Sequence, residues 1–343
     1  MENKLALISE SLYSRVPYCS GIRAIPAHQF LLYYGRDSDQ CQRVDLSRPS
    51  TTQMQALVKA CEPATFGRDQ EDVLDETYRK AGKLDTPAFA TLFSAENAGL
   101  VDIIRANLLQ GDIEKRDIRL EMYKLNVYGK DSFFKAHKDT PRGEDMFGSL
   151  VIVFPTPHEG GALVIRQDAK EWTVDVTEAF AEASEPSIGY IAFYSDVEHE
   201  VALVKSGYRV TLTYNLYFTG DERQDFPPPV PYVAEEELKA LLVDLLSDEG
   251  VLPDGGYIGF GLQYQYPVST GTKLRKLRKC LKGNDALLGR VCDALNFEWF
   301  IRVLYRGAGL SRWRKAHVLT DRSSTCRNMA RWKMCWTSWV GKL

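Results

Sequence analysis

Hydrophobic and polar residues alternate along the middle of the chain, which is the period-two pattern of β-strands. From Ile118 onward this pattern predicts short strands separated by turn residues, at 118–128, 134–140, 149–154, 161–165, 172–176, 189–194 and 207–217. Strands of this number and length suit a double-sheet jelly roll, whose mouth can house a site. The middle of the chain is therefore expected to form the core domain.

The first 117 residues predict an α+β segment that braces this core. Residues 29–34 and 42–46 have the pattern of a β-hairpin, and residues 51–60 that of an amphipathic helix capped by Ser50. A second helix is predicted over 97–109. The charged stretch 66–80 allows two interpretations: a solvent-exposed helix, which charge at helical spacing favours, or a lid over the site.

The composition changes after residue 220. Residues 221–233 are polar and rich in proline, which predicts an extended linker. Residues 234–306 predict a smaller α+β appendage, with helices at 234–247, 273–282 and 286–295 and strands at 257–266 and 299–305. The basic tail, 307–343, has no convincing period and is expected to be a mobile interaction tail or to lie outside the folded unit.

Composition narrows the function classes. A chain of 343 residues with 44% hydrophobic residues is typical of a globular protein with a sizeable core. Its net charge of −3 gives no overall attraction to nucleic acid or membrane, which favours a peptide or small-molecule substrate. The seven scattered cysteines fit a reducing compartment. No signal peptide or membrane span is evident, so a cytoplasmic or nuclear location is expected.

Two candidate metal ligands, His137 and Asp139, stand two residues apart. On a β-strand they would point to the same face and could share one ion. His199, 60 residues after Asp139, begins another strand-like run and would supply a third ligand. Two histidines and one carboxylate form a facial triad that leaves coordination positions open, which suits a non-haem Fe(II) enzyme.

Arg209 follows His199 by ten residues and shares a strand face with Thr211. A guanidinium stays charged and binds a carboxylate through two hydrogen bonds. Arg209 therefore suits the far carboxylate of a keto-diacid chelated by the metal, with Thr211 as a further hydroxyl donor. Arg142, just beyond the first two ligands, could reach a substrate carboxylate or stay solvated.

Residues 121–217 resemble the double-stranded β-helix domain of Fe(II)/2-oxoglutarate dioxygenases, in the prolyl 4-hydroxylase-like branch. The matching features run in family order: Tyr128, His137-x-Asp139, Glu159-Gly160-Gly161-x-Leu163, His199 and Arg209. The resemblance implies that His137, Asp139 and His199 bind Fe(II), and that Arg209 and Tyr128 contact 2-oxoglutarate. It also implies O2 as a cosubstrate and admits ascorbate as an auxiliary reductant.

The implied fold is α+β, with a double-stranded β-helix (jelly roll) core at 118–220 braced by helices and followed by the smaller C-terminal α+β appendage. The implied reaction hydroxylates an unactivated C–H bond of a peptidyl (prolyl-like) or small-molecule substrate and releases succinate and CO2. Many collagen-type prolyl hydroxylases carry Lys at the position of Arg209, so this residue departs from that subgroup.

Three alternatives stay open. One is desaturation or ring chemistry on a small metabolite, and another is a non-catalytic interaction protein that keeps the fold. The third is a cupin-like metal enzyme without 2-oxoglutarate, which would have no use for Arg209. A nucleic-acid substrate is unlikely on this pattern, because nucleic-acid demethylases of the superfamily carry a second Arg six residues after the cosubstrate arginine, where this chain has Asn215.

Overall fold

The structure is a computed structural model that describes residues 2–12, 16–35, 41–68, 71–109, 116–140, 142–143, 145–167, 169–222, 233–248, 250–251, 256–266, 273–306, 317–320 and 332–340. The chain divides into two compact units. One consists of Pro17–Leu108 and Asp117–Gly220, and the other of Met1–Val16, Leu109–Arg116 and Asp221–Leu343. Strands predominate in both units, and no described helix is both long and apolar enough to cross a membrane.

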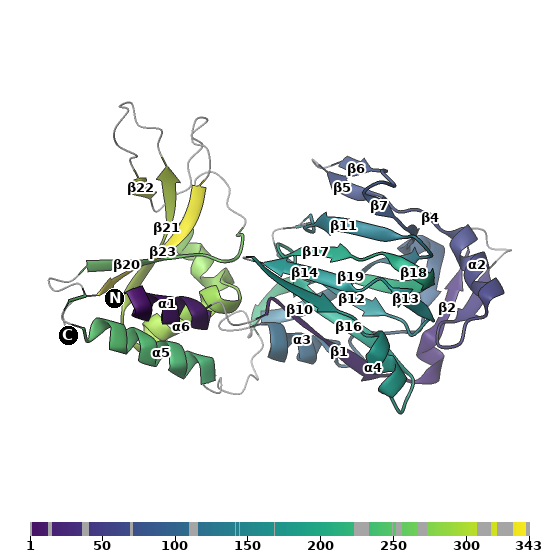
Figure 1. Ribbon diagram of the computed structural model, residues 1–343, viewed down its shortest axis with the longest axis horizontal. Helices are drawn as coiled ribbons and strands as arrows, with labels where there is room; N and C mark the ends of the chain where they lie inside the picture. Colours follow the sequence, from purple (N-terminus) through teal and green to yellow (C-terminus); the bar gives the residue numbers. More distant parts are fainter. Residues whose placement is uncertain are drawn as a thin grey trace. The chain divides into compact units, whose positions relative to one another are not determined.

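Two antiparallel sheets form the core of the first unit (Figure 1). The larger sheet runs in the order β1 (Tyr18–Ala24), β16 (Ser187–Tyr194), β12 (Met146–Val153), β19 (Arg209–Glu222), β10 (Arg116–Tyr128), β8 (Gly82–Asp85) and β4 (Glu62–Pro63). The smaller runs in the order β15 (Lys170–Val174), β14 (Leu163–Gln167), β17 (Glu198–Val201), β11 (Phe133–His137) and β7 (Arg79–Lys80). This arrangement confirms the predicted α+β class and double-stranded β-helix core.

Side-chain alternation on β19 explains why the larger sheet can carry a site. Val210, Leu212 and Leu216 are fully buried on one face and contribute to the hydrophobic core. The alternate residues of the strand are polar and line a cavity on the other face: Arg209, Thr211, Thr213 and Asn215. One strand thus serves both the core and the site.

The remaining elements of this unit cover its margins. The predicted hairpin is β2 (Leu31–Tyr34) with β3 (Gln42–Asp45), and β2 also pairs with β9 (Phe89–Thr91). Two more strands, β13 (His158–Gly160) and β18 (Val204–Gly207), pair with each other. The helices are α2 (Thr51–Ala60), α3 (Leu100–Leu108) and α4 (Thr177–Glu182), of which α3 and α4 contact β16. Ser50 caps α2 as predicted, in a capping box with Gln53.

The charged stretch 66–80 does not form the exposed helix that its spacing favoured. It forms the hairpin β5 (Phe66–Arg68) and β6 (Glu71–Val73), a turn, and then β7, which pairs with β11. The rings of Phe66 and Tyr78 lie 6.3 and 6.1 Å from the ring of Phe134. The structure of this stretch is decided by the pairing of β7 with β11 and by aromatic packing against Phe134. The spacing of charges within 66–80 cannot reveal these contacts, because their partners lie more than 50 residues further along the chain.

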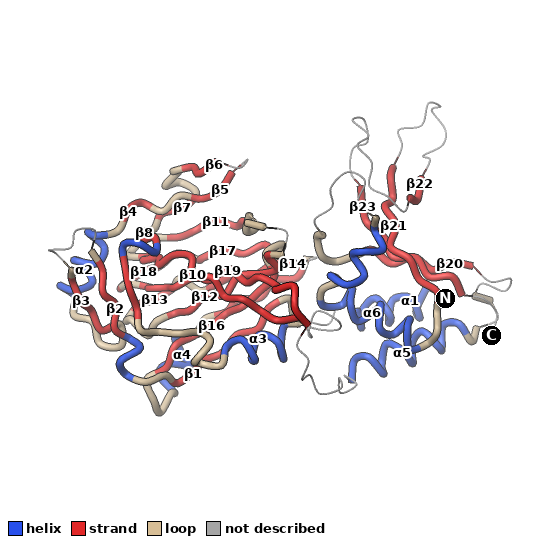
Figure 2. The backbone as a smooth tube through the Cα atoms, turned by 180° about the vertical axis from the view of Figure 1, so that it is seen from behind, coloured by secondary structure: helices blue, strands red, loops and turns tan. Residues whose placement is uncertain are grey.

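The second unit is a smaller α+β assembly (Figure 2). Its elements are α1 (Glu2–Leu12), α5 (Val233–Leu246), β20 (Gly256–Gly261), α6 (Gly283–Ala294), β21 (Glu298–Arg306), β22 (His317–Thr320) and β23 (Trp332–Val340). The strands form an antiparallel sheet in the order β20-β23-β21-β22. Helix α1 packs on α5, with an ion pair of 2.9 Å between Lys4 Nζ and Asp244 Oδ2.

Three predictions for the C-terminal region need correction. The basic stretch 273–282 contains a 3-10 helix, Leu274–Cys280, and no α-helix. The strand predicted at 257–266 ends at Gly261. The tail includes two strands, β22 and β23, so it is not wholly irregular. Because β23 pairs with β20 and β21, its structure depends on partners distant in sequence.

Most of the predicted linker, 223–232, and the rest of the tail lie outside the described residues. The predicted domain boundaries stay predictions. The compact units differ from them at the N-terminus, where Met1–Val16 groups with Asp221–Leu343.

Candidate metal and cosubstrate site

A cavity of about 830 Å³ lies in the first unit between the two sheets. Its lining comes from β10, β12 and β19 of the larger sheet, from β11, β14 and β17 of the smaller one, and from residues 65–79. All the candidate site residues line this one cavity: Tyr128, His137, Asp139, His199, Arg209 and Thr211. Tertiary structure therefore gathers residues that the sequence spreads over 84 positions, from 128 to 211.

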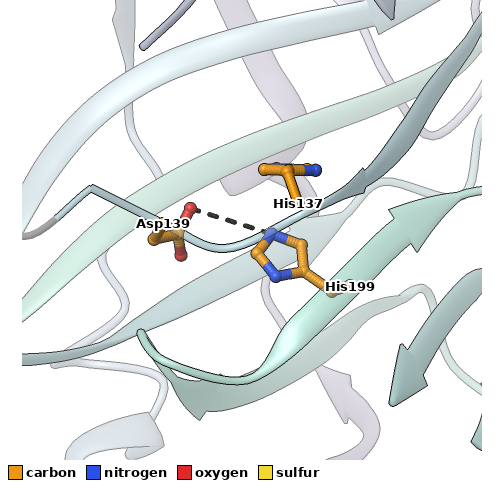
Figure 3. A group of neighbouring side chains, drawn as sticks. All are labelled: His137, Asp139 and His199. Carbon is orange, nitrogen blue, oxygen red and sulfur yellow. Dashed lines mark ion pairs between the residues drawn. The ribbon is translucent and has the colours of Figure 1, made fainter. Parts of the chain in front are cut away.

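The three candidate metal ligands converge (Figure 3). His137 and His199 are Cα partners across β11 and β17, and their ring centroids are 4.2 Å apart. Asp139 Oδ1 lies 3.7 Å from His199 Nε2. One ligand atom from each residue can be chosen so that all three lie within 4.8 Å of one another, close enough to share one ion.

Local backbone geometry differs from the simple strand that the His-x-Asp spacing suggested. Strand β11 ends at His137, and a register shift relative to β17 occurs between Phe134 and His137. Such a bulge redirects side chains at the end of a strand. Asp139 lies just beyond the strand, where its backbone N–H donates to Ser195 O at 3.1 Å. The pair shares a site because the loop is held there, not because both residues belong to one regular strand.

Hydrogen bonds orient both imidazoles. His137 Nδ1 lies 2.8 Å from Lys135 O, and His199 Nδ1 lies 3.0 Å from Val197 O. When Nδ1 donates to a carbonyl, the proton is fixed there and the Nε2 lone pair is left for a metal. The Phe134 ring stacks on His137 at a centroid distance of 3.5 Å, which further restricts that ring.

The electrostatics favour neutral histidine. Burial, helped by the nearby His199, lowers the pKa of His137 to about 2. A neutral imidazole is the form that binds a metal, so no proton has to be displaced from this residue at neutral pH.

Ser149 on β12 holds the carboxylate. Its Oγ donates to Asp139 Oδ2 at 2.6 Å, which leaves Oδ1 facing His199. Ser149 is buried, and no motif in the sequence marks it. Its role depends on a contact between the larger sheet and the loop after β11, which only the tertiary structure creates.

Arg209 is the most unusual charge in the cavity. It is 3% exposed, and no carboxylate of the described chain lies within ion-pair distance of it. Its guanidinium carbon lies 5.7 Å from the centre of the Tyr128 ring, and burial lowers its pKa from the ordinary value. A buried charge without a counter-ion is costly, so this arrangement is suited to an anionic ligand.

Gly161 makes room for Arg209. Its φ of +74° favours glycine, and a Cβ added there would lie 2.8 Å from Arg209 Cδ. The Gly160-Gly161 motif therefore has a physical role next to the guanidinium: it permits a close backbone approach.

Several cavity residues escaped the sequence prediction. Asn126 connects β10 to its surroundings, because its amide donates to Thr213 Oγ1 at 3.2 Å and its Oδ1 accepts from Arg79 at 2.8 Å. Lys124 on the same strand also lines the cavity. Asn126 shares the face of Tyr128, and the alternation of β10 could have indicated both residues.

The donor set fits Fe(II) and 2-oxoglutarate. Two free imidazole nitrogens and one carboxylate oxygen form a facial triad, and Arg209 and Thr211 lie on the adjacent polar face for a diacid. The chemistry of the residues alone thus agrees with the resemblance found in the sequence.

Comparisons with known proteins agree with this assignment. Residues 123–217 match the family model described as the 2OG-Fe(II) oxygenase superfamily. No curated protein sequence matches the chain.

Among solved structures, a Pseudomonas putida prolyl-4-hydroxylase is similar with 18% identity and a TM-score of 0.35, covering 62% of this chain and 98% of that one. A 2OG-Fe(II) oxygenase family oxidoreductase from Burkholderia pseudomallei has 15% identity, a TM-score of 0.30 and coverages of 62% and 90%. A Trichoplax adhaerens prolyl hydroxylase, solved with a hypoxia inducible factor peptide fragment, has 14% identity, a TM-score of 0.35 and coverages of 62% and 90%. These scores are low and carry no argument, so the similarity to the 2OG-Fe(II) oxygenase superfamily rests on the family-model match over residues 123–217.

Proposed function

We propose that this protein is an Fe(II)- and 2-oxoglutarate-dependent dioxygenase that hydroxylates an unactivated C–H bond of a peptidyl, prolyl-like, or small-molecule substrate and releases succinate and CO2. One observation carries the proposal. The triad of His137, Asp139 and His199 and the unpaired guanidinium of Arg209 line the same cavity.

Each of these residues would have a distinct task. His137, Asp139 and His199 would hold Fe(II), and Arg209 would bind the far carboxylate of 2-oxoglutarate, with Thr211 and Tyr128 beside it. The metal, when bound, supplies the oxygen chemistry. The protein fixes the geometry: backbone carbonyls orient the imidazoles, and Ser149 orients the Asp139 carboxylate.

Exclusion of water is the second contribution of the chain. The hairpin β5–β6 and the turn before β7 bring Phe66 and Tyr78 to the cavity beside Phe134. The Tyr78 hydroxyl donates to Ala136 O at 2.8 Å, one residue before the first ligand. We assign this segment as the lid that was one interpretation of the charged stretch.

The buried Arg209 argues against the cupin-like alternative, because such an enzyme would bury this charge without a ligand for it. The non-catalytic alternative would not need imidazoles oriented for metal binding. Ascorbate as an auxiliary reductant and a cytoplasmic or nuclear location stay predictions.

Anaerobic titration of the purified protein with Fe(II) and 2-oxoglutarate tests the proposal. We expect the visible charge-transfer band of a metal-chelated 2-oxoglutarate in the wild type and no band in His199→Ala, because two protein ligands bind iron far more weakly than three. Succinate release in air then screens candidate substrates. Folded wild-type protein without the band would contradict the proposal and favour a non-catalytic protein.

A further inference from the structure

The cavity carries more positive charge than the proposed cofactors need. Among its described lining residues, five are cationic and two are acidic: Arg79, Lys124, Lys138, Arg142 and Arg209 against Asp75 and Asp139. None of the five has a carboxylate of the described chain within ion-pair distance. Fe(II) and 2-oxoglutarate carry opposite double charges, so their binding leaves this surplus in place. Arg79, Lys124 and Arg209 are the buried members of this group, so the lining is suited to a further anion.

Lys124 is the best placed of the unused cations. It is 6% exposed, and its ammonium contacts the Tyr123 ring, with Nζ 4.0 Å from the centroid. Burial, reinforced by the positive charge of Arg79, lowers the pKa of Lys124 to about 8. Arg142, at the exposed edge of the cavity, donates to the Tyr123 hydroxyl. Two cations therefore flank one aromatic ring.

The contacts between β10 and β19 indicate which residue of β19 lies opposite Lys124. The two strands are neighbours, with Tyr128 near Arg209 and Asn126 bonded to Thr213. Two residues further along each strand, Lys124 falls next to Asn215. Asn215 is 3% exposed and lines the cavity; its buried Nδ2 makes no hydrogen bond of normal length and angle within the described chain, and the side chains of Glu121 and Tyr217 lie near it. A buried ammonium and a buried amide thus lie at this end of the cavity. The ammonium has no ion-pair partner in the described chain, because Asp85, its cross-strand neighbour, is paired with Lys83 at 2.6 Å.

This second group of donors is separate from the Arg209 end. Asn215 lies six residue steps along the strand from Arg209, which is roughly 20 Å at the usual rise per residue. A molecule as short as 2-oxoglutarate cannot reach both ends. Asn215 is also the cross-strand partner of Ser149, whose hydroxyl bonds Asp139. Lys124 and Asn215 therefore lie at the end of the cavity near the candidate metal ligands, where a substrate has to bind.

We propose that Lys124 and Asn215, with Arg142 at the edge, form a substrate subsite for a carboxylate, so that the substrate of this oxygenase is an organic acid or a peptide with a free C-terminal carboxylate. Tyr123 provides an apolar surface beside the acid group. This inference rests on the proposed function, because it assigns the substrate class of the same cavity. It makes Lys124 a specificity-determining residue, not a catalytic one.

The test compares matched acids and amides as probes. Wild type, Lys124→Met and the control Lys130→Met, which removes an exposed lysine outside the cavity, are loaded with Zn(II) and saturating 2-oxoglutarate. The probes are 3-phenylpropionate against 3-phenylpropionamide, and N-acetylglycyl-phenylalanine as free acid against its amide. Dissociation constants come from saturation-transfer NMR. The Fe(II)–2-oxoglutarate band, measured separately, shows that the variants still fold and bind cofactors.

We expect wild type and Lys130→Met to bind the acid of at least one pair roughly 10- to 100-fold more tightly than its amide, as a charge-assisted hydrogen bond allows. Lys124→Met should bind both members equally. A preference in the first pair indicates a small acid, and a preference only in the second indicates a peptide C-terminus; both support the subsite.

Equal binding of acid and amide by wild type in both pairs would overturn the subsite, as would a preference that persists in Lys124→Met or an acid that displaces 2-oxoglutarate. These results are distinguishable from failure of the proposed function. If the proposed function is wrong, wild type forms no Fe(II)–2-oxoglutarate band. The acid preference at Lys124 is a separate measurement that uses no iron.

Discussion

The two sheets that enclose the cavity prepare their polar groups in opposite ways. On the smaller sheet, the Nδ1 atoms of the His137 and His199 rings already have backbone partners. On the larger sheet, Arg209 and Lys124 are buried charges without carboxylate partners in the described chain. In the proposed function, a metal would complete the first arrangement and anions would complete the second.

This difference indicates where binding energy is used. Imidazoles already oriented by backbone carbonyls cost little in the empty protein, so the metal site can be preorganised. Unpaired buried cations destabilise the empty protein and favour its anion-bound state. We therefore expect the smaller sheet to govern metal affinity and the larger sheet to govern the affinity and choice of carboxylate ligands.

The largest effect should come from Arg209→Met. If this variant altered the affinities for both Fe(II) and 2-oxoglutarate, the two sheets would not have separate tasks. We expect the 2-oxoglutarate concentration for half-maximal band intensity to rise roughly 10- to 100-fold, because a charge-assisted pair is lost. Fe(II) affinity should not change. Anaerobic titrations of each ligand measure the two quantities.

Arg48→Met is the matched control for that variant, since Arg48 is exposed and lies outside the cavity. It should titrate like wild type. An unchanged 2-oxoglutarate requirement in Arg209→Met would remove Arg209 from the cosubstrate site.

Gly161→Ala should have an intermediate effect. It sharpens the comparison of the two sheets, because it displaces the Arg209 side chain without removing its charge. The added Cβ would lie 2.8 Å from Arg209 Cδ at a φ of +74°. We expect the 2-oxoglutarate requirement to rise up to about tenfold, with a loss of about 1–2 kcal/mol in the free energy of unfolding. Titration and denaturant unfolding measure these effects; a stability loss with normal 2-oxoglutarate binding would contradict the positioning role.

The smallest effect concerns the smaller sheet in the metal-free protein. The folded pKa of His137 is about 2 and its unfolded value is near 6.5, so the unfolded chain binds more protons between these values. Stability from this residue is complete above about pH 6.5 and falls as the pH drops toward 2, by at most about 1.4 kcal/mol per pH unit.

Unfolding free energies of wild type and His137→Leu between pH 7.5 and 5 measure this contribution. We expect the slope below pH 6.5 to be shallower in His137→Leu. Equal slopes in both proteins would mean that His137 takes up its proton in the folded state as readily as in the unfolded state.

Local patterns determined much of the core. Alternation located the strands of the double sheet, and Ser50 marked the start of α2. The spacing of His137, Asp139, His199 and Arg209 identified the candidate site, because the family arrangement places these residues at fixed intervals on neighbouring strands. Short-range periodicity and motif spacing are properties of the sequence itself.

The tertiary structure decided what depends on contacts between distant residues. Pairing with β11 made a strand of Arg79–Lys80 in the charged stretch, and pairing with β20 and β21 made a strand of 332–340. Ser149 acquired its bond to Asp139, and Asn126 its bond to Thr213, across strands far apart in the chain. A sequence states which charges exist, but only the fold decides which of them are buried without a counter-ion, and here that distinction points to the ligands.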